Sequence, residues 1–103
     1  MTMRIVVMGV SGCGKSTVGK MLASKLSAKF VDGDDLHPEE NKAKMAAGIA
    51  LNDEDRWPWL DKVGASLDEN DKIVIACSAL KRKYRERILD SANNSVFVHL
   101  DGT

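Results

Sequence analysis

A glycine-rich stretch near the N-terminus combines a lysine and a serine at a spacing that suits phosphate binding. Residues 9–16 read G-x-x-x-x-G-K-S, directly after an apolar run and directly before a segment with helical periodicity. Glycines let the backbone curl around an anion, so that N–H groups and a helix N-terminus surround the phosphate oxygens. The lysine can bridge the outer phosphates, and the serine hydroxyl is placed for Mg²⁺. The alternative is a glycine-rich turn that only caps a helix.

This loop predicts a site for the phosphates of a nucleotide together with Mg²⁺. Lys15 is the expected catalytic cation, and Ser16 is the expected Mg²⁺ ligand. The residues expected to contact the nucleotide are Gly9, Val10, Ser11, Gly12, Cys13, Gly14, Lys15, Ser16 and Thr17.

A group of carboxylates follows the next apolar strand. Residues 30–35 read F-V-D-G-D-D, and strand alternation would point Asp32 and Asp34 in the same direction, toward the phosphate loop. One acid can hold water on Mg²⁺, while the next accepts the proton of an attacking hydroxyl. The alternative is that these acids form a turn and cap the coming helix.

Further polar side chains could hold a substrate. His37, Asn41 and Lys44 follow at helical spacing, which offers donors and a positive charge to an anionic, hydroxyl-rich molecule; an exposed polar face is the alternative. Arg56 suits either a bidentate carboxylate contact or a surface ion pair. In the basic run 81–87, Lys81 is nearest to a strand end and is the best candidate to reach the site, whereas the other cations are expected to be solvated.

Aromatic residues and the second histidine are expected to have packing roles. Trp57 and Trp59 are interpreted as helix packing rather than as platforms for a base. His99 falls within an apolar strand, which favours a neutral, hydrogen-bonded core histidine.

Alternating strands and helices must position these groups. Apolar runs predict strands over 4–8, 29–31, 73–76 and 96–100, and helical patterns cover 15–27, 38–47, 53–67 and 81–92. This order predicts an α/β fold, a parallel sheet sandwiched by helices, which binds ligands beyond the carboxyl ends of the strands. The weakly apolar start of segment 36–67 favours a mobile, substrate-binding helical segment.

Composition limits the classes of partner. The chain has 103 residues, enough for a single domain over 1–103, and its 15 basic residues balance 15 acidic ones. No overall charge therefore favours nucleic acid or a membrane surface. Apolar runs are far shorter than the ~20 residues of a membrane span, and the early first strand leaves no room for a leader, so a cytoplasmic location is expected.

Taken together, the motifs resemble the thermoresistant gluconokinase family, which is related to shikimate kinase. The resemblance is carried by residues 9–16, 32–38, 41, 44–45, 48, 51–60 and 77–81. It implies a phosphate-loop, nucleoside-kinase-like fold and ATP-dependent phosphorylation of D-gluconate to 6-phospho-D-gluconate with Mg²⁺.

The resemblance also implies individual roles. Asp32 would support the Mg²⁺ shell beside Ser16, and Asp34 would orient or deprotonate the reacting hydroxyl. Arg56, with His37 and Lys44, would hold the gluconate carboxylate and hydroxyls.

The chain is shorter than members of that family and stops just past the predicted fourth strand. We therefore expect an incomplete, C-terminally truncated domain without the lid, the last strand and the adenine-binding segment. Two other functions stay open: a non-catalytic, truncated nucleotide-binding module, and a kinase for another small hydroxy acid such as shikimate. Assembly as a homodimer is also left open.

Overall fold

The centre of the molecule is a four-stranded, fully parallel sheet. The computed structural model describes residues 2–9, 14–78 and 81–99. The strands stand in the order β2-β3-β1-β4, and every neighbouring pair is parallel. Their bounds are β1 Met3–Gly9, β2 Lys29–Asp32, β3 Lys72–Ser78 and β4 Val96–His99.

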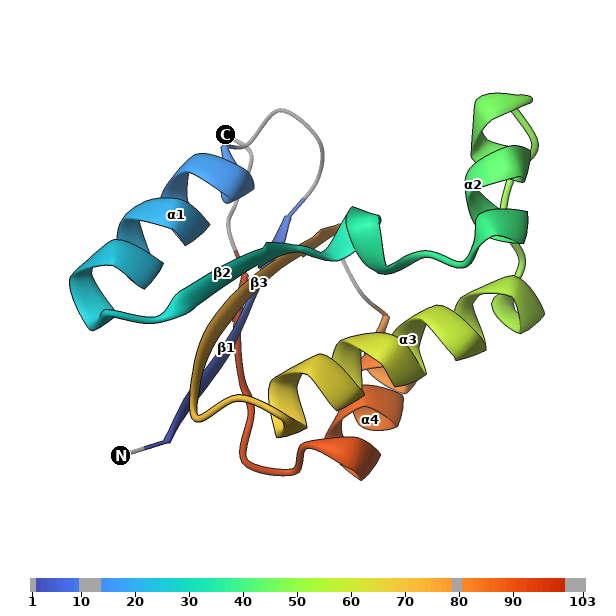
Figure 1. Cartoon of the computed structure of the whole chain (residues 1–103). Coiled ribbons are helices and arrows are strands. Elements are labelled where there is room, and N and C mark those ends of the chain that lie inside the picture. Colours follow the sequence, from blue (N-terminus) through green and yellow to red (C-terminus); the bar gives the residue numbers. More distant parts are fainter. Residues whose placement is uncertain (1, 10–13, 79–80, 100–103) are drawn as a thin grey trace.

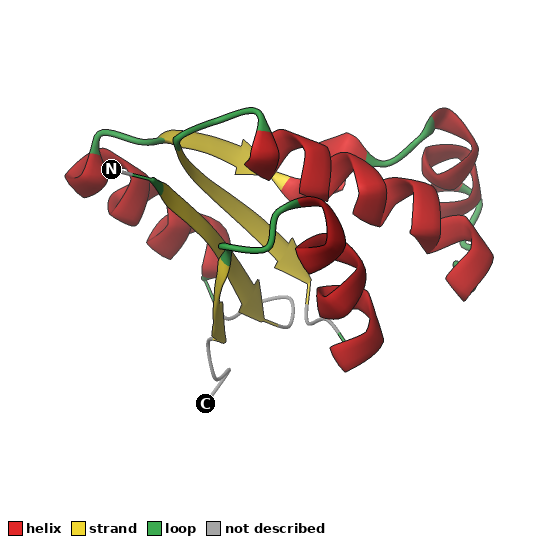
Figure 2. Cartoon of the chain, turned by 90° about the horizontal axis from the view of Figure 1, so that it is seen from below, coloured by secondary structure: helices red, strands yellow, loops and turns green. Residues whose placement is uncertain are grey.

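Helices cover both faces of this sheet (Figures 1 and 2). One face carries α1, and the other carries α3 and α4, whereas α2 stands off the sheet beyond the start of α3 (Figure 1). The helices are α1 Lys15–Leu26, α2 Glu39–Ala46, α3 Asp53–Asp68 and α4 Arg82–Ser91, with a 3₁₀ turn, η1, at Gly33–Leu36. The predicted α/β fold is confirmed, and no helix in the described ranges has the length and apolar character needed to span a bilayer.

The two central strands form the core because their side chains are buried on both faces. Val6 and Ile75 pack with α3 and α4 residues such as Leu60, whereas Val7 and Val74 pack under α1. These side chains are all fully buried. At about 25 cal/mol per Å² of apolar surface, such burial is the main stabilisation available to a chain of this size.

Arg4 joins β1 to the C-terminal end of α3. Its Nε donates to the carbonyl oxygens of Leu67, at 2.5 Å, and Asn70, at 2.9 Å, and its Nη2 donates to the carbonyl of Asp68 at 3.1 Å. The last carbonyls of a helix lack partners within the helix, and the last turn of α3 has no basic residue of its own. A guanidinium from the neighbouring strand therefore satisfies this helix end.

The second strand extends one residue beyond its predicted range of 29–31 but does not continue to Asp34. It stops at Asp32, and the chain turns directly into η1, where the Asp32 carboxylate accepts a hydrogen bond from the Asp34 N–H at 3.0 Å. Gly33 allows η1 to lie close against β3, because a Cβ there would lie 2.7 Å from the Ala76 carbonyl oxygen. The expected strand alternation from Asp32 to Asp34 is therefore wrong, and the capping alternative holds for Asp32.

The fourth strand is less buried than its apolar sequence predicts. β4 lies at the edge of the sheet, and His99 at its end is exposed. A core position for His99 was therefore wrong, because an apolar sequence run marks a strand but does not determine how much of that strand is covered.

Candidate active site

The described ends of the phosphate loop have the predicted geometry. β1 ends at Gly9, and α1 begins at Lys15 directly after Gly14, which has a φ of 77°. This left-handed conformation favours glycine and turns the chain into the helix. The predicted contacts of Val10, Ser11, Gly12 and Cys13, and of the Lys15 side chain, lie outside the described parts of the structure; Thr17 is exposed in the first turn of α1.

The two predicted metal-binding residues share a hollow beside this loop. Its volume is about 450 Å³. It is lined by Ser16, Lys20, Phe30, Val31, Asp32 and Asp35. Hydroxyl and carboxylate oxygens suit Mg²⁺, which takes one or two protein ligands together with phosphates and water. Across the described residues no group of three or more His, Cys, Asp or Glu side chains could hold a metal ion.

A second hollow, of about 440 Å³, lies on the other side of η1. Three of the predicted substrate residues meet here, although they come from different segments: Asp34 from η1, His37 just after it and Arg56 from α3. The remaining lining residues are Met45, Gly48, Ile49, Ala50, Leu51 and Trp59. Asp34 and Asp32 thus line different hollows, because the 3₁₀ turn separates two side chains that a strand would have aligned.

Trp59 forms a rigid support for this second hollow. Its Nε1–H donates to the Gly33 carbonyl at 2.8 Å, which ties α3 to η1. The His37 ring stacks on the indole with a centroid separation of 4.3 Å and an interplanar angle of 16°. Trp59 is buried, and Trp57 packs against the same core, which confirms the predicted packing role of both tryptophans.

Asn41 and Lys44 connect α2 to the start of α3. The Asn41 amide nitrogen lies 2.7 Å from the Asp55 carbonyl oxygen and 3.1 Å from His37 Nδ1. Lys44 Nζ pairs with the Asp55 carboxylate at 2.8 Å. His37 and Asn41 are buried, so the exposed-face alternative is wrong for both. Lys44 does not line the hollow that contains Asp34, since its ammonium is directed to Asp55.

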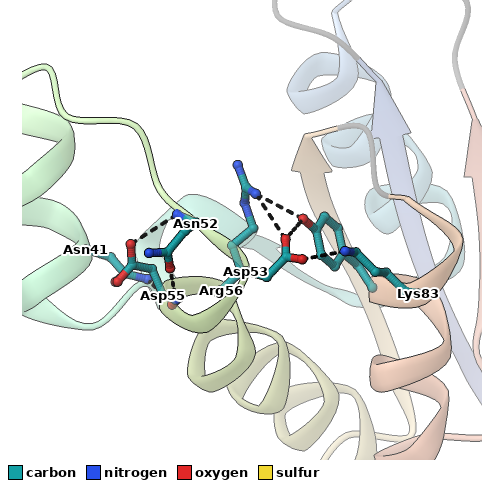
Figure 3. A network of polar contacts seen from close by, with 7 residues as sticks. Asn41, Asn52, Asp53, Asp55, Arg56 and Lys83 are labelled. Atoms are coloured by element: carbon teal, nitrogen blue, oxygen red, sulfur yellow. Dashed lines mark hydrogen bonds and ion pairs between the residues drawn. The ribbon is translucent and has the colours of Figure 1, made fainter.

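The start of α3 is stabilised by a reciprocal cap. The Asn52 side chain accepts from the Asp55 N–H at 2.8 Å, and the Asp55 carboxylate accepts from the Asn52 N–H at 3.1 Å. This capping box (Figure 3) satisfies two donors at the helix start. Asp55 therefore caps the start of α3, and the cap fixes the backbone next to Arg56.

Arg56 is oriented by a polar network that joins α3 to α4 (Figure 3). Its Nη1 donates to the Tyr84 hydroxyl at 3.0 Å and lies 3.7 Å from the Asp53 carboxylate. Tyr84 and Lys83 both donate to Asp53. Arg56 therefore forms an ion pair, as one of its two interpretations expects, and it also lines the hollow. Its contact with a substrate stays a prediction. The role of Tyr84 was not predicted, because its contacts with Arg56 and Asp53 arise only when α4 packs against α3.

Lys81 lies just before α4 and close to this network. Its Nζ is 6.0 Å from the centroid of the Tyr84 ring, and the side chain is exposed. It does not line the hollow that contains Asp34. Its predicted substrate contact therefore stays a prediction.

Local charges and burial shift several pKa values. Hydrogen bonds from Lys83 and Tyr84 lower the pKa of Asp53, and the hydrogen bond from Lys44 lowers the pKa of Asp55. Burial lowers the pKa of His37 below 6.5, although nearby Asp34 acts in the opposite direction. The hollow thus combines a carboxylate acceptor, a guanidinium and a neutral imidazole, which suits a small anionic molecule rich in hydroxyls.

This chain is similar to known proteins over most of its length. The family model described as shikimate kinase matches residues 11–103. A gluconokinase from Arabidopsis thaliana is 54% identical over 86 residues, which cover 80% of this chain and 46% of that protein. The thermosensitive gluconokinase of Escherichia coli K12 is 46% identical over 101 residues, which cover 94% of this chain and 54% of that protein.

A solved structure agrees with these relatives. The crystal structure of a gluconokinase from Sinorhizobium meliloti 1021 superposes with a TM-score of 0.86 at 50% identity, covering 94% of this chain and 56% of that one. The chain spans about half the length of the relatives that it matches. The chain therefore belongs to the shikimate kinase family, and the relatives that it resembles at about half sequence identity are gluconokinases.

Proposed function

We propose that this chain binds Mg·ATP and D-gluconate and transfers the γ-phosphoryl group to the terminal hydroxyl of gluconate. The observation that carries the proposal is the convergence of Asp34, His37 and Arg56 in one hollow. A carboxylate acceptor and a guanidinium on the same walls match a molecule with a hydroxyl at one end and a carboxylate at the other. The names of the relatives support gluconate over shikimate.

The two hollows flank the same short turn, which suits transfer between two bound substrates. Ser16 and Asp32 line one hollow, and Asp34 lines the other. A phosphate tail held by residues 9–17 would therefore end close to a hydroxyl held at Asp34. Phosphoryl transfer depends mainly on such positioning and on neutralisation of charge.

The reaction follows from these placements. Asp34 accepts the proton of the gluconate hydroxyl while that oxygen forms a bond to the γ-phosphorus and the bond to the bridging oxygen of ADP breaks. Lys15 stabilises the charge on the phosphoryl oxygens. Bound Mg²⁺, held by Ser16 and through water by Asp32, would neutralise charge on the outer phosphates. Arg56 and His37 hold the acid and its hydroxyls. Lys44 and Lys81 are further proposed substrate contacts, although neither lines the hollow in this structure.

We further propose that segment 36–67 is a mobile, substrate-binding segment in which α2 shifts when substrate binds. The support is that α2 stands off the sheet (Figure 1), whereas the buried residues of α3 anchor the rest of the segment in the core. A cytoplasmic location and assembly into a homodimer complete the proposal. Cell fractionation tests the location, and light scattering on the purified chain tests the assembly.

ADP release from the purified chain tests the proposed reaction. The protein is given Mg·ATP with gluconate, with shikimate or with AMP, and we expect ADP release to depend on gluconate. A dependence on shikimate would assign the other hydroxy-acid kinase activity. ATP binding without any acceptor-stimulated turnover would favour the non-catalytic nucleotide-binding module, an alternative that the half-length match to the relatives keeps relevant.

A further inference from the structure

The buried Asn41 side chain has a fixed orientation. One of its side-chain atoms lies 2.7 Å from the Asp55 carbonyl oxygen. A carbonyl oxygen only accepts hydrogen bonds, so the atom facing it must be the amide nitrogen, Nδ2. Asn41 is 3% exposed, which leaves little room for water to relax this requirement.

The same amide nitrogen determines which nitrogen of His37 carries the proton. Nδ2 lies 3.1 Å from His37 Nδ1 and offers its second hydrogen there, so Nδ1 must accept. A neutral imidazole with an accepting Nδ1 carries its hydrogen on Nε2. We infer that Asn41 is a positioning residue that holds His37 as the neutral Nε2–H tautomer and so makes it a hydrogen-bond donor toward the ligand hollow.

The surroundings of His37 favour the neutral ring. An imidazolium would place an N–H on Nδ1 against the N–H of Asn41, which would lose the contact. The charged groups around the ring are Asp34 from η1, Arg56 from α3 and Lys42 from α2: the carboxylate favours a proton, while the two cations oppose it. The neighbouring Lys44–Asp55 pair is internally neutralised. Burial opposes protonation further.

This tautomer restricts what the hollow can bind. His37 then supplies a donor, Arg56 supplies further donors, and Asp34 supplies an acceptor. A ligand must offer an oxygen with free lone pairs to His37, as a hydroxyl or carboxylate does. This consequence rests on the proposed function, whereas the tautomer itself does not.

Nitrogen NMR of ¹⁵N-labelled protein tests the tautomer directly. The chain has two histidines, so His99→Gln leaves the His37 signals alone for assignment. At pH 7 we expect His37 to show a non-protonated Nδ1 and a protonated Nε2. A protonated Nδ1, or two protonated nitrogens, would overturn the inference. Added gluconate should shift the Nε2 signal; the expected tautomer without that shift would count against the gluconate site alone.

A substitution tests whether Asn41 is the cause. In Asn41→Asp the carboxylate can only accept, so we expect Nδ1 to become protonated and the titration midpoint of His37 to move to higher pH. A His37 spectrum identical to that of the unaltered chain would refute the role of Asn41. If that variant does not fold, Asn41→Ala serves instead: loss of the donor should give averaged tautomer signals, and an unchanged Nε2–H pattern would again overturn the inference.

Discussion

The Arg56 guanidinium donates to the Tyr84 hydroxyl across 3.0 Å and thereby links the start of α3 to α4. The same hydroxyl donates to Asp53, whose carboxylate also pairs with Arg56 at 3.7 Å. The hydroxyl thus both accepts and donates, which only a phenol or an alcohol can do at this point. The orientation of Arg56 in the ligand hollow therefore depends on a residue of another helix.

The first prediction concerns this hydroxyl. Tyr84→Phe keeps the buried ring but removes the group that joins Arg56 to Asp53. Loss of one such hydrogen bond is worth about 1 kcal/mol, so we expect gluconate affinity to fall by roughly fivefold. Isothermal titration calorimetry with gluconate measures the change. Arg82→Gln is the control, since this side chain is 85% exposed and pairs only with Glu86 in the described structure; equal affinities in the two variants would contradict the prediction.

The second prediction concerns the proposed base. Asp34→Asn keeps the size of the side chain but cannot accept the hydroxyl proton, so we expect kcat with gluconate to fall by about 100- to 10,000-fold. Mg·ATP affinity should stay near that of the unaltered chain, because Asp34 lines the hollow away from Ser16. Coupled ADP assays and calorimetry measure the two quantities.

Asp68→Asn provides the matched comparison for Asp34. It removes an exposed carboxylate at the end of α3, far along the helix from the hollow. We expect its kcat to equal that of the unaltered chain. Similar rates for Asp34→Asn and Asp68→Asn would remove Asp34 from the mechanism.

The pattern of apolar residues predicted the parallel sheet between helices, because the central strands are buried on both faces. The run at β3 is apolar without interruption, as expected for a strand covered by helices on each side. The helical pattern also predicted the start of α3 at residue 53, where the acids of the first turn suit the positive end of the helix dipole. The burial of β4 could not be predicted in this way, since it depends on what covers each face.

The sequence predicted which residues form the site better than it predicted the contacts between them. Asp34, His37 and Arg56 were selected for their chemistry and do share a hollow. The direction of Asp34 was not predictable from strand alternation, because the strand ends at Asp32 and the chain enters η1 at Gly33. Tyr84 contacts Asp53 and Arg56 across about thirty residues of sequence, a pairing that only helix packing creates.

The third prediction concerns stability rather than activity. Arg4→Met keeps a long apolar stem but leaves the carbonyls of Leu67, Asp68 and Asn70 without their charged donor. Hydrogen bonds to a charged group contribute about 1.5 to 3 kcal/mol, so we expect the free energy of unfolding to fall by about that amount. Urea denaturation measures it, with Lys72→Met as the control at an exposed lysine of β3. Equal loss in both variants would contradict the capping role of Arg4.

The fourth prediction concerns pH. The pKa of folded His37 lies below its ordinary 6.5, mainly because of burial. Below pH 6.5 the unfolded chain therefore takes up a proton that the folded chain resists. The stability associated with neutral His37 is complete above pH 6.5 and is lost as the pH falls through the lowered folded value. We expect urea denaturation between pH 8 and pH 5 to show a steeper loss of stability in the unaltered chain than in His37→Gln. His99→Gln should keep the steep loss; a slope in His37→Gln equal to that of the unaltered chain would show that His37 is not the group responsible.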